Sequence, residues 1–185
     1  MEIFDVVNES GQPIGEIVSR ETAHRLGIRH RTAHVWIVRR KGDSADVLLQ
    51  KRSREKDSFP GCLDTSSAGH IPAGSEPAAS AIRELHEELG ITAKEDELLF
   101  AGNFSADYER VFHGKPFHDN EFVSVYVLQR DIRDEEIMIQ PEELESVEWR
   151  DYFETEAALA RHDPAFCIPS RGFAILGKWL FPGKR

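Results

Sequence analysis

The alternation of apolar and polar positions predicts two pairs of strands near the start of the chain. Residues 2–7 and 14–18 have strand character and are separated by turn-forming residues, so we expect them to form a hairpin. Residues 31–40 are rich in β-branched and aromatic side chains, and residues 47–52 follow them after a Gly-Asp-Ser turn. We expect these two segments to pair in the core. Residues 20–30 are polar and are expected to be a connector.

A second group of strands is predicted in the later part of the chain. Residues 97–109 read as a strand with a polar end, and residues 110–120 as the tip of a hairpin. The alternation over residues 121–129 predicts the returning strand, with Glu121 at its start. Two shorter strands are expected at residues 137–140 and 147–150.

Helical spacing returns near the C-terminus, at residues 152–161 and 172–180, with prolines between the two segments. Strands mixed with a few helices indicate an α+β or α/β fold, in which helices cover both sides of a mixed sheet. A chain of 185 residues is long enough for one well-buried domain and short for two. We therefore predict a single domain over residues 1–185, with residues 1–30 as an N-terminal hairpin extension.

Composition and charge narrow the classes of protein. A hydrophobic fraction of 40% and a charged fraction of 30% are typical of a soluble globular protein, and no apolar run is long enough to span a bilayer. The acidic N-terminus lacks the layout of a secretory signal, so we predict a cytoplasmic protein. The net charge of −10 argues against general nucleic-acid binding. Cys62 and Cys167 are expected to be unpaired and buried.

The stretch from Gly69 to Ile91 is the one around which the rest of the chain is organised. It opens with a glycine-rich loop, enters a helical pattern at Pro77 and ends at Gly90, where a left-handed C-cap is common. Five apolar residues recur at helical spacing and predict the buried face of this helix. They are Ala78, Ala81, Ile82, Leu85 and Leu89.

Three glutamates, Glu84, Glu87 and Glu88, lie at i, i+3 and i+4 on another face of the predicted helix. They repel one another, and Glu87 and Glu88 occupy the last turn, where the helix dipole disfavours carboxylates by about 0.3–1 kcal/mol each. Most glutamate clusters are solvated helix faces. A hard divalent cation is the alternative explanation, because Mg²⁺ takes oxygen ligands and completes its shell with water and substrate phosphate.

A basic loop precedes this stretch and offers candidate phosphate ligands. Lys51, Arg52, Arg54 and Lys56 lie in it. Such a run usually solubilises a strand end. Because an arginine can bind phosphate oxygens with two parallel hydrogen bonds, we select Arg52 and Lys56 as candidate substrate-binding residues.

The glycine-to-isoleucine stretch resembles the Nudix box, which reads Gly, five residues, Glu, seven residues, then Arg-Glu-apolar-x-Glu-Glu-x-Gly-apolar. The positions in register are Gly69, Arg83, Glu84, Leu85, Glu87, Glu88, Gly90 and Ile91. The chain departs from the box at Ser75, where the family has its first Glu, and Glu76 is displaced from that place by one position.

This resemblance implies an α/β/α sandwich and hydrolysis of a diphosphate bond with Mg²⁺, for which Mn²⁺ can substitute. It implies that Glu84, Glu87 and Glu88 hold the metal with the backbone carbonyl of Ala68, and that Arg83 orients a box glutamate. A bound metal would neutralise charge at phosphorus and lower the pKa of a water molecule that attacks it.

The catalytic base stays open among Glu84, Glu88 and Glu121. Glu121 is the candidate from outside the box and is also a candidate metal ligand.

A narrower resemblance is to the branch of the superfamily that includes isopentenyl diphosphate isomerase. It is carried by the N-terminal hairpin, HRTAHVWIV, the basic loop ending in FPG, SSAGH and the later DNEF. It implies a possible second metal site. The corresponding positions are His24, His30, His70, Asp119 and Glu121, and His70 is also a candidate substrate ligand. For each histidine alone, a structural role is the ordinary interpretation.

Ala68 separates hydrolysis from isomerisation. The isomerase has an essential cysteine just before its Gly-His pair, where this chain has Ala68, and alanine cannot carry a proton. We therefore predict hydrolysis of a nucleoside diphosphate derivative or of a related small molecule such as an isoprenoid diphosphate. The alternatives are isomerisation and a non-catalytic nucleotide-binding module. The free edge of the N-terminal hairpin also suggests a possible homodimer.

Overall fold

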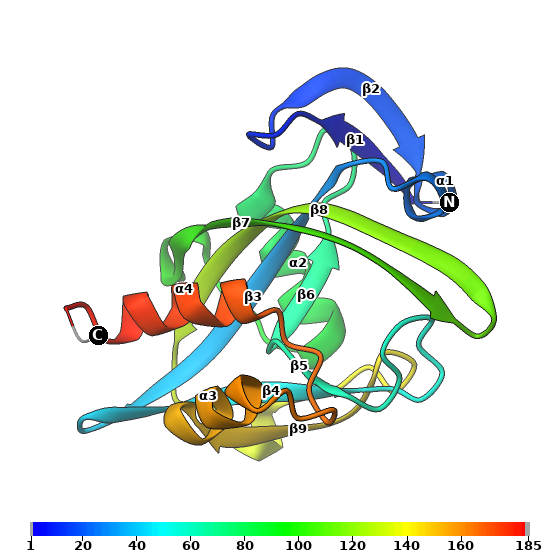
Figure 1. Ribbon diagram of the computed structural model, residues 1–185. Helices are drawn as coiled ribbons and strands as arrows, with labels where there is room; N and C mark the ends of the chain where they lie inside the picture. Colours follow the sequence, from blue (N-terminus) through cyan, green and yellow to red (C-terminus); the bar gives the residue numbers. More distant parts are fainter. Residues whose placement is uncertain (1, 184–185) are drawn as a thin grey trace.

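A mixed sheet forms the centre of the computed structural model, which describes residues 2–183 (Figure 1). Its strands are β3 (His30–Lys41), β4 (Ser44–Arg52), β5 (Leu63–Asp64), β6 (Ser67–His70), β7 (Leu98–Phe112), β8 (Lys115–Gln129) and β9 (Leu144–Asp151). The order is β5–β4–β3–β8–β7, with β6 paired to β3 and β9 paired to β4. Strands β3 and β8 run parallel and the other pairs antiparallel, which confirms the predicted mixed sheet.

Helices cover both faces of this sheet. Helix α2 (Pro77–Leu89) packs on one face, and α3 (Tyr152–Ala160) and α4 (Ser170–Leu180) pack on the other (Figure 1). Short 3₁₀ turns occur at η1 (Glu95–Glu97) and η2 (Asp134–Glu136). The predicted α/β/α layering is therefore confirmed. Within the part of the chain that is described, no helix combines the length and apolar character needed to cross a membrane.

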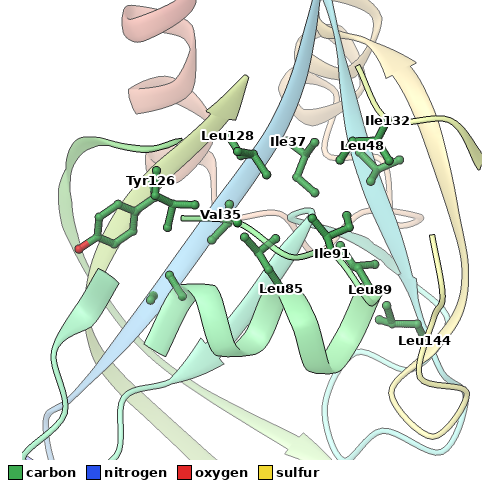
Figure 2. Packing of buried hydrophobic residues seen from close by; sticks show 14 of the residues in the cluster. Val35, Ile37, Leu48, Leu85, Leu89, Ile91, Tyr126, Leu128, Ile132 and Leu144 are labelled. Atoms are coloured by element: carbon green, nitrogen blue, oxygen red, sulfur yellow. The ribbon is translucent and has the colours of Figure 1, made fainter. Parts of the chain in front are cut away.

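The core under α2 is formed by the apolar stripe read from the sequence. Leu85 and Leu89 are fully buried and point from the helix toward Val35, Ile37 and Leu128 of the sheet (Figure 2). Burying a leucine side chain contributes about 1.5–3 kcal/mol, so this contact fixes the helix and with it the glutamates on its other face.

The opposite core holds the sheet against α3 and α4. Trp36 is fully buried, and its ring meets Phe173 edge-on with 5.5 Å between centroids. Tyr152 stacks on the other side of Phe173 at 4.7 Å. These aromatic contacts fix the middle of β3 from the face that carries Trp36.

The N-terminal hairpin consists of β1 (Ile3–Val7) and β2 (Pro13–Ser19), as predicted, and is followed by a helix that the sequence analysis missed. Residues 20–30 were expected to be a connector, but α1 (Arg20–Leu26) occupies most of this segment. Ser19 caps its first turn by accepting a hydrogen bond from the Thr22 N–H, and Gly27 ends it with φ at 64°.

Three further expectations about the strands are wrong. Residues 137–140 form no strand. Met138 donates instead to the Leu89 carbonyl and Gln140 to the Glu88 carbonyl, at 2.9 and 3.0 Å, which attaches this segment to the C-terminal end of α2. The predicted hairpin tip at 110–120 is mostly strand. Because β8 begins at Lys115, Glu121 lies within the strand and not at its start.

Candidate functional site

A cavity of about 750 Å³ lies between α1, α2, the long β7–β8 hairpin and the loop that follows β4. It brings together nearly all the site residues predicted from the sequence. Those that line it are His24, Arg52, Lys56, Ala68, His70, Arg83, Glu84, Glu87, Glu88, Asp119 and Glu121. His30 is fully buried directly beside them, since its ring nitrogen lies 4.0 Å from Asp119.

The box glutamates approach the cavity over strand β6. Glu88 is 6% exposed, and its Oε2 accepts a hydrogen bond of 3.3 Å from the Ala68 N–H. Arg83 pairs with Glu84, lies 3.7 Å from Glu87 and donates to the His70 carbonyl at 3.2 Å. The arginine therefore ties two glutamates of the helix to the strand, which agrees with the orienting role implied for it.

Gly69 is required for this close approach. A β-carbon at Gly69 would lie 2.2 Å from the Glu84 carboxyl carbon, far inside contact distance. We predict that Gly69→Ala displaces the Glu84 carboxylate and, if the chain has the diphosphate hydrolase activity that the box resemblance implies, lowers its kcat by about 10- to 100-fold, because small misplacements of reacting groups are costly. Gly74→Ala, where the added methyl group meets nothing, is the control for kcat, although its positive φ of 76° strains the backbone. Equal activities of both variants would contradict the role given to Gly69.

Burial sets the charge state of these carboxylates in the metal-free protein. It raises the pKa of Glu88 to about 8, and the neighbouring Glu84 charge adds to this effect. Burial also raises the pKa of Glu84, against which the hydrogen bond from Arg83 acts. Ionisation of these two neighbouring carboxyls is unfavourable in the metal-free protein. A cation bound between them would favour their ionised forms and would offset that cost.

The raised pKa of Glu88 makes the stability of the metal-free protein depend on pH. The pKa of Glu88 is about 8 in the folded protein and lies near 4.5 when unperturbed, so its contribution to stability is fully present below pH 4.5 and is lost as the pH rises toward 8. Each pKa unit corresponds to about 1.4 kcal/mol, and the loss reaches a few kcal/mol. Urea unfolding in EDTA at pH 5 and pH 8 measures it. Glu88→Gln should lose less stability than the wild type over this interval, and equal losses would contradict the assignment.

A second group of ligand-type side chains lines or borders the same cavity. The side-chain atoms of His24, His30 and His70 lie within 4.8 Å of one another, and so do those of His30, Asp119 and Glu121. The individual separations support one centre. The distance from His24 to Asp119 is 3.6 Å, and Glu121 lies 3.9 Å from His30 and 3.8 Å from His70. We name these five residues the histidine centre.

The buried atoms of the histidine centre fit a metal ion. His30 Nε2, His70 Nε2 and Asp119 Oδ1 are buried and find no hydrogen-bond partner among the described residues. His30 Nδ1 lies 2.9 Å from the Ile28 carbonyl and can donate to it, which places the lone pair on Nε2. Burial lowers the pKa of His30 and, more strongly, of His70, so both rings are neutral as ligands must be. Phe4 stacks on both rings, with centroids 4.9 and 4.6 Å away.

The two predicted phosphate ligands line the cavity but already have partners. Arg52 donates to Asp64 at 3.2 Å and to the Ser58 carbonyl at 2.9 Å, which closes the loop after β4. Lys56 pairs with Glu143. Either cation can therefore contact a substrate only by giving up one of these partners or by using N–H groups that they leave free.

The N-terminal hairpin supports the loop that precedes α2. Asp5 accepts hydrogen bonds of 2.8 Å from Arg31 and 2.9 Å from the Gly74 N–H. Arg31 also donates to the Ser75 carbonyl at 3.1 Å. These contacts hold the loop at the position where the chain has Ser75 in place of the first box Glu. Glu76 is exposed and lies outside the cavity lining.

Some cavity residues were not selected from the sequence. Phe59 and Tyr108 line the cavity, as do His34, Asp64 and Glu143. The sequence offered no spacing that links these residues to the box, because strand pairing and the loop after β4 bring them there. Both cysteines are free thiols and are half-buried, not fully buried as expected; Cys167 reaches the cavity wall.

The family follows from a comparison with protein-family models. A model described as the NUDIX domain matches residues 28–167. This chain belongs to the Nudix family. Nudix hydrolase 3 of Arabidopsis thaliana is 41% identical to it over 167 residues, which cover 89% of this chain and 21% of that protein. The chain thus spans about a fifth of the length of this relative.

Two further proteins bear on the branch and the fold. An isopentenyl-diphosphate Delta-isomerase of Dinoroseobacter shibae is 27% identical over 154 residues, covering 81% of this chain and 77% of that protein. The crystal structure of DR0079 from Deinococcus radiodurans superimposes with a TM-score of 0.67 at 22% identity and covers 95% of this chain and 98% of that one. The structural similarity therefore extends beyond residues 28–167 into the N-terminal part of the chain, and a weaker sequence similarity reaches an isopentenyl-diphosphate Delta-isomerase.

Proposed function

We propose that this Nudix chain is a divalent-cation-dependent hydrolase that cleaves the diphosphate bond of a nucleoside diphosphate derivative or a related small molecule. The observation that carries the proposal is the convergence of Glu84, Glu87 and Glu88 with the backbone of Ala68 on one cavity. These oxygens would hold Mg²⁺, or Mn²⁺ in its place. When bound, such a cation neutralises diphosphate oxygens and lowers the pKa of a water molecule.

The residues of the chain supply orientation and proton acceptance. Arg83 holds Glu84 toward β6, and the Ala68 N–H holds Glu88. Burial raises the pKa values of Glu84, Glu88 and Glu121, so these are the cavity carboxylates suited to accept a proton from the attacking water.

A phosphate-release screen tests the proposal. The panel comprises nucleoside diphosphates, nucleotide sugars, dinucleotides and isoprenoid diphosphates, each with Mg²⁺ and with Mn²⁺. Dinucleotide and sugar reactions are coupled to a phosphatase so that monophosphate products are counted. Metal-dependent release from at least one class is expected. Binding without turnover across the panel would favour the alternative of a non-catalytic nucleotide-binding module.

Diphosphate isomerisation is the second candidate function, and the histidine centre is the observation that favours it. His24, His30, His70, Asp119 and Glu121 together offer a possible second metal site of nitrogen and oxygen ligands. Against isomerisation, the cavity wall at position 68 is a methyl group that cannot carry a proton. Formation of dimethylallyl diphosphate from isopentenyl diphosphate without phosphate release would establish it.

We also infer that residues 1–185 act as one domain in the cytoplasm, with residues 1–30 as its hairpin extension. Residues 1, 184 and 185 lie outside the described part of the chain. The homodimer suggested by the hairpin edge stays a prediction that sedimentation analysis can test.

A further inference from the structure

His34 is a buried polar side chain in the cavity that none of the roles above uses. It lies in the middle of β3, lines the cavity and is only 7% exposed. Its Nδ1 atom is buried and has no hydrogen-bond partner within residues 2–183. Buried polar atoms are nearly always paired, so an unpaired one on a cavity wall points to a partner that arrives with a ligand.

Strand register explains why the imidazole can be reached from the cavity. His34 is paired directly with Ala68 across the antiparallel β3–β6 ladder. Side chains at paired positions stand on the same face of the sheet, about 4.5–5.5 Å apart at their β-carbons. Because the side chain of Ala68 is only a methyl group, it leaves space beside the His34 imidazole on the cavity side. We name the space over these two side chains the Ala68 recess.

The other neighbours of His34 do not satisfy its ring. The Phe104 ring lies edge-on at 5.8 Å between centroids and offers only apolar contact. The charges that act on the imidazole are Asp64, Asp119 and Arg52, and no hydrogen bond joins any of them to it among the described residues. Burial lowers the pKa of His34, so the ring is neutral and carries one N–H donor and one acceptor nitrogen.

A purely structural role is a poor explanation for this residue. The same face of β3 continues into Trp36, which is packed among aromatic rings. Phenylalanine at position 34 would extend that packing without leaving a buried polar atom unpaired, at a saving of about 1–3 kcal/mol. The imidazole is therefore explained better by a contact that forms when a ligand is present.

We propose that His34 determines substrate class: its imidazole hydrogen-bonds a hydroxyl or carbonyl group of the diphosphate substrate that enters the Ala68 recess, so that the enzyme prefers a nucleoside diphosphate derivative to an isoprenoid diphosphate. This inference rests on the proposed hydrolase function. A site built to hydrogen-bond its substrate discriminates strongly against an analogue without the matching group, because the site's own polar atom is then left buried and unpaired. The hydrocarbon tail of an isoprenoid offers no such group.

Two substitutions of His34 separate hydrogen bonding from packing. His34→Phe keeps an aromatic ring and removes both ring nitrogens. His34→Asn is the matched variant, since its side-chain amide offers a polar atom close to the position of Nδ1. We expect His34→Phe to lower kcat/KM for ADP-ribose by about 10- to 100-fold, the equivalent of one lost buried hydrogen bond. The value for dimethylallyl diphosphate should stay equal or rise. His34→Asn should recover part of the loss for ADP-ribose.

Binding to a non-hydrolysing background distinguishes this inference from the proposed function. In a Glu88→Gln protein, calorimetry with ADP-ribose and with dimethylallyl diphosphate reports the effect of His34→Phe on Kd without turnover. A change in the ratio of the two Kd values supports the role of His34 even if the wild-type enzyme hydrolyses no member of the panel, an outcome that would overturn only the hydrolase proposal. Equal effects on both compounds, or binding of neither, would overturn the role of His34.

Discussion

Replacing Glu88 with Gln is expected to lower metal-dependent phosphate release by at least about 100-fold while the protein stays folded. The substitution removes one anionic oxygen from the site where Glu84 and the Ala68 backbone also converge. Metal stabilisation of charge at phosphorus is worth several kcal/mol, and each 1.36 kcal/mol is about tenfold in rate. The folded state is not at risk, because a neutral amide removes a buried carboxyl whose pKa is about 8. Release is measured with excess Mg²⁺ on the substrate found in the panel.

Two further variants show whether the loss of activity in Glu88→Gln is specific to the box carboxylates. Glu87→Gln changes a side chain that is half-exposed in the cavity, and the loss should be of similar order if Glu87 is a ligand. Glu76→Gln makes the same chemical change just before the same helix, outside the cavity, and should alter the rate by less than about twofold. If Glu88→Gln and Glu87→Gln both release phosphate at the wild-type rate, the box does not hold the catalytic metal.

If Mn²⁺ binds the histidine centre as the second candidate function requires, His70→Gln is expected to abolish most of the thermal stabilisation that the ion gives. A ligand that binds only the folded state stabilises it by about 2.7 kcal/mol at 100 times its Kd. For a chain of this size that corresponds to a rise of about 5–10 °C in Tm. The substitution removes one of the five candidate ligands, next to the buried Nε2 atom of His30. The Mn²⁺-induced rise in Tm should then fall to the part that comes from metal bound at Glu84, Glu87 and Glu88.

The matched control for His70→Gln is His86→Gln, which changes an exposed histidine outside the cavity lining. Each variant is compared with and without Mn²⁺, so that the loss of ring stacking on Phe4 in His70→Gln cancels. Coupling to imidazole nitrogen in the pulsed electron paramagnetic resonance spectrum of bound Mn²⁺ reports directly on the histidine centre, because the box glutamates offer oxygen ligands only. An unchanged metal-induced rise in Tm, with nitrogen coupling retained at wild-type strength, would remove His70 from the centre.

The sequence predicted those parts of the molecule whose determinants are local. The box helix follows from the spacing of Leu85 and Leu89 and from Gly90, whose left-handed conformation ends the helix as expected. The mixed sheet, the N-terminal hairpin and the two C-terminal helices were likewise predicted from periodicity. In the box helix and in β3 one face is buried, so the pattern in the chain reflects the pattern in the fold, whereas β2 of the hairpin is mostly exposed and was indicated by its strand-like composition and the turn residues before it.

The parts that could not be predicted depend on contacts between distant segments. Residues 137–140 have strand-like composition, but their hydrogen bonds go to the end of α2, and no local signal shows that. The polar composition of α1 hid a helix whose signals were its caps, Ser19 and Gly27. The selection of His34 as a candidate needed the pairing of β3 with β6, since a lone histidine in an apolar strand is ordinarily a core residue.

The contact between Asp5 and the loop before α2 has a consequence for where this unit can be cut from a longer polypeptide. The match to the family model starts at residue 28, so a fragment trimmed to that boundary keeps every box glutamate and loses the carboxylate that anchors Gly74 and Arg31. It also loses Phe4, which stacks on two rings of the histidine centre. We therefore expect that a functional fragment must begin before residue 28, where the family match starts. A partner fused to the N-terminal side should be joined upstream of β1.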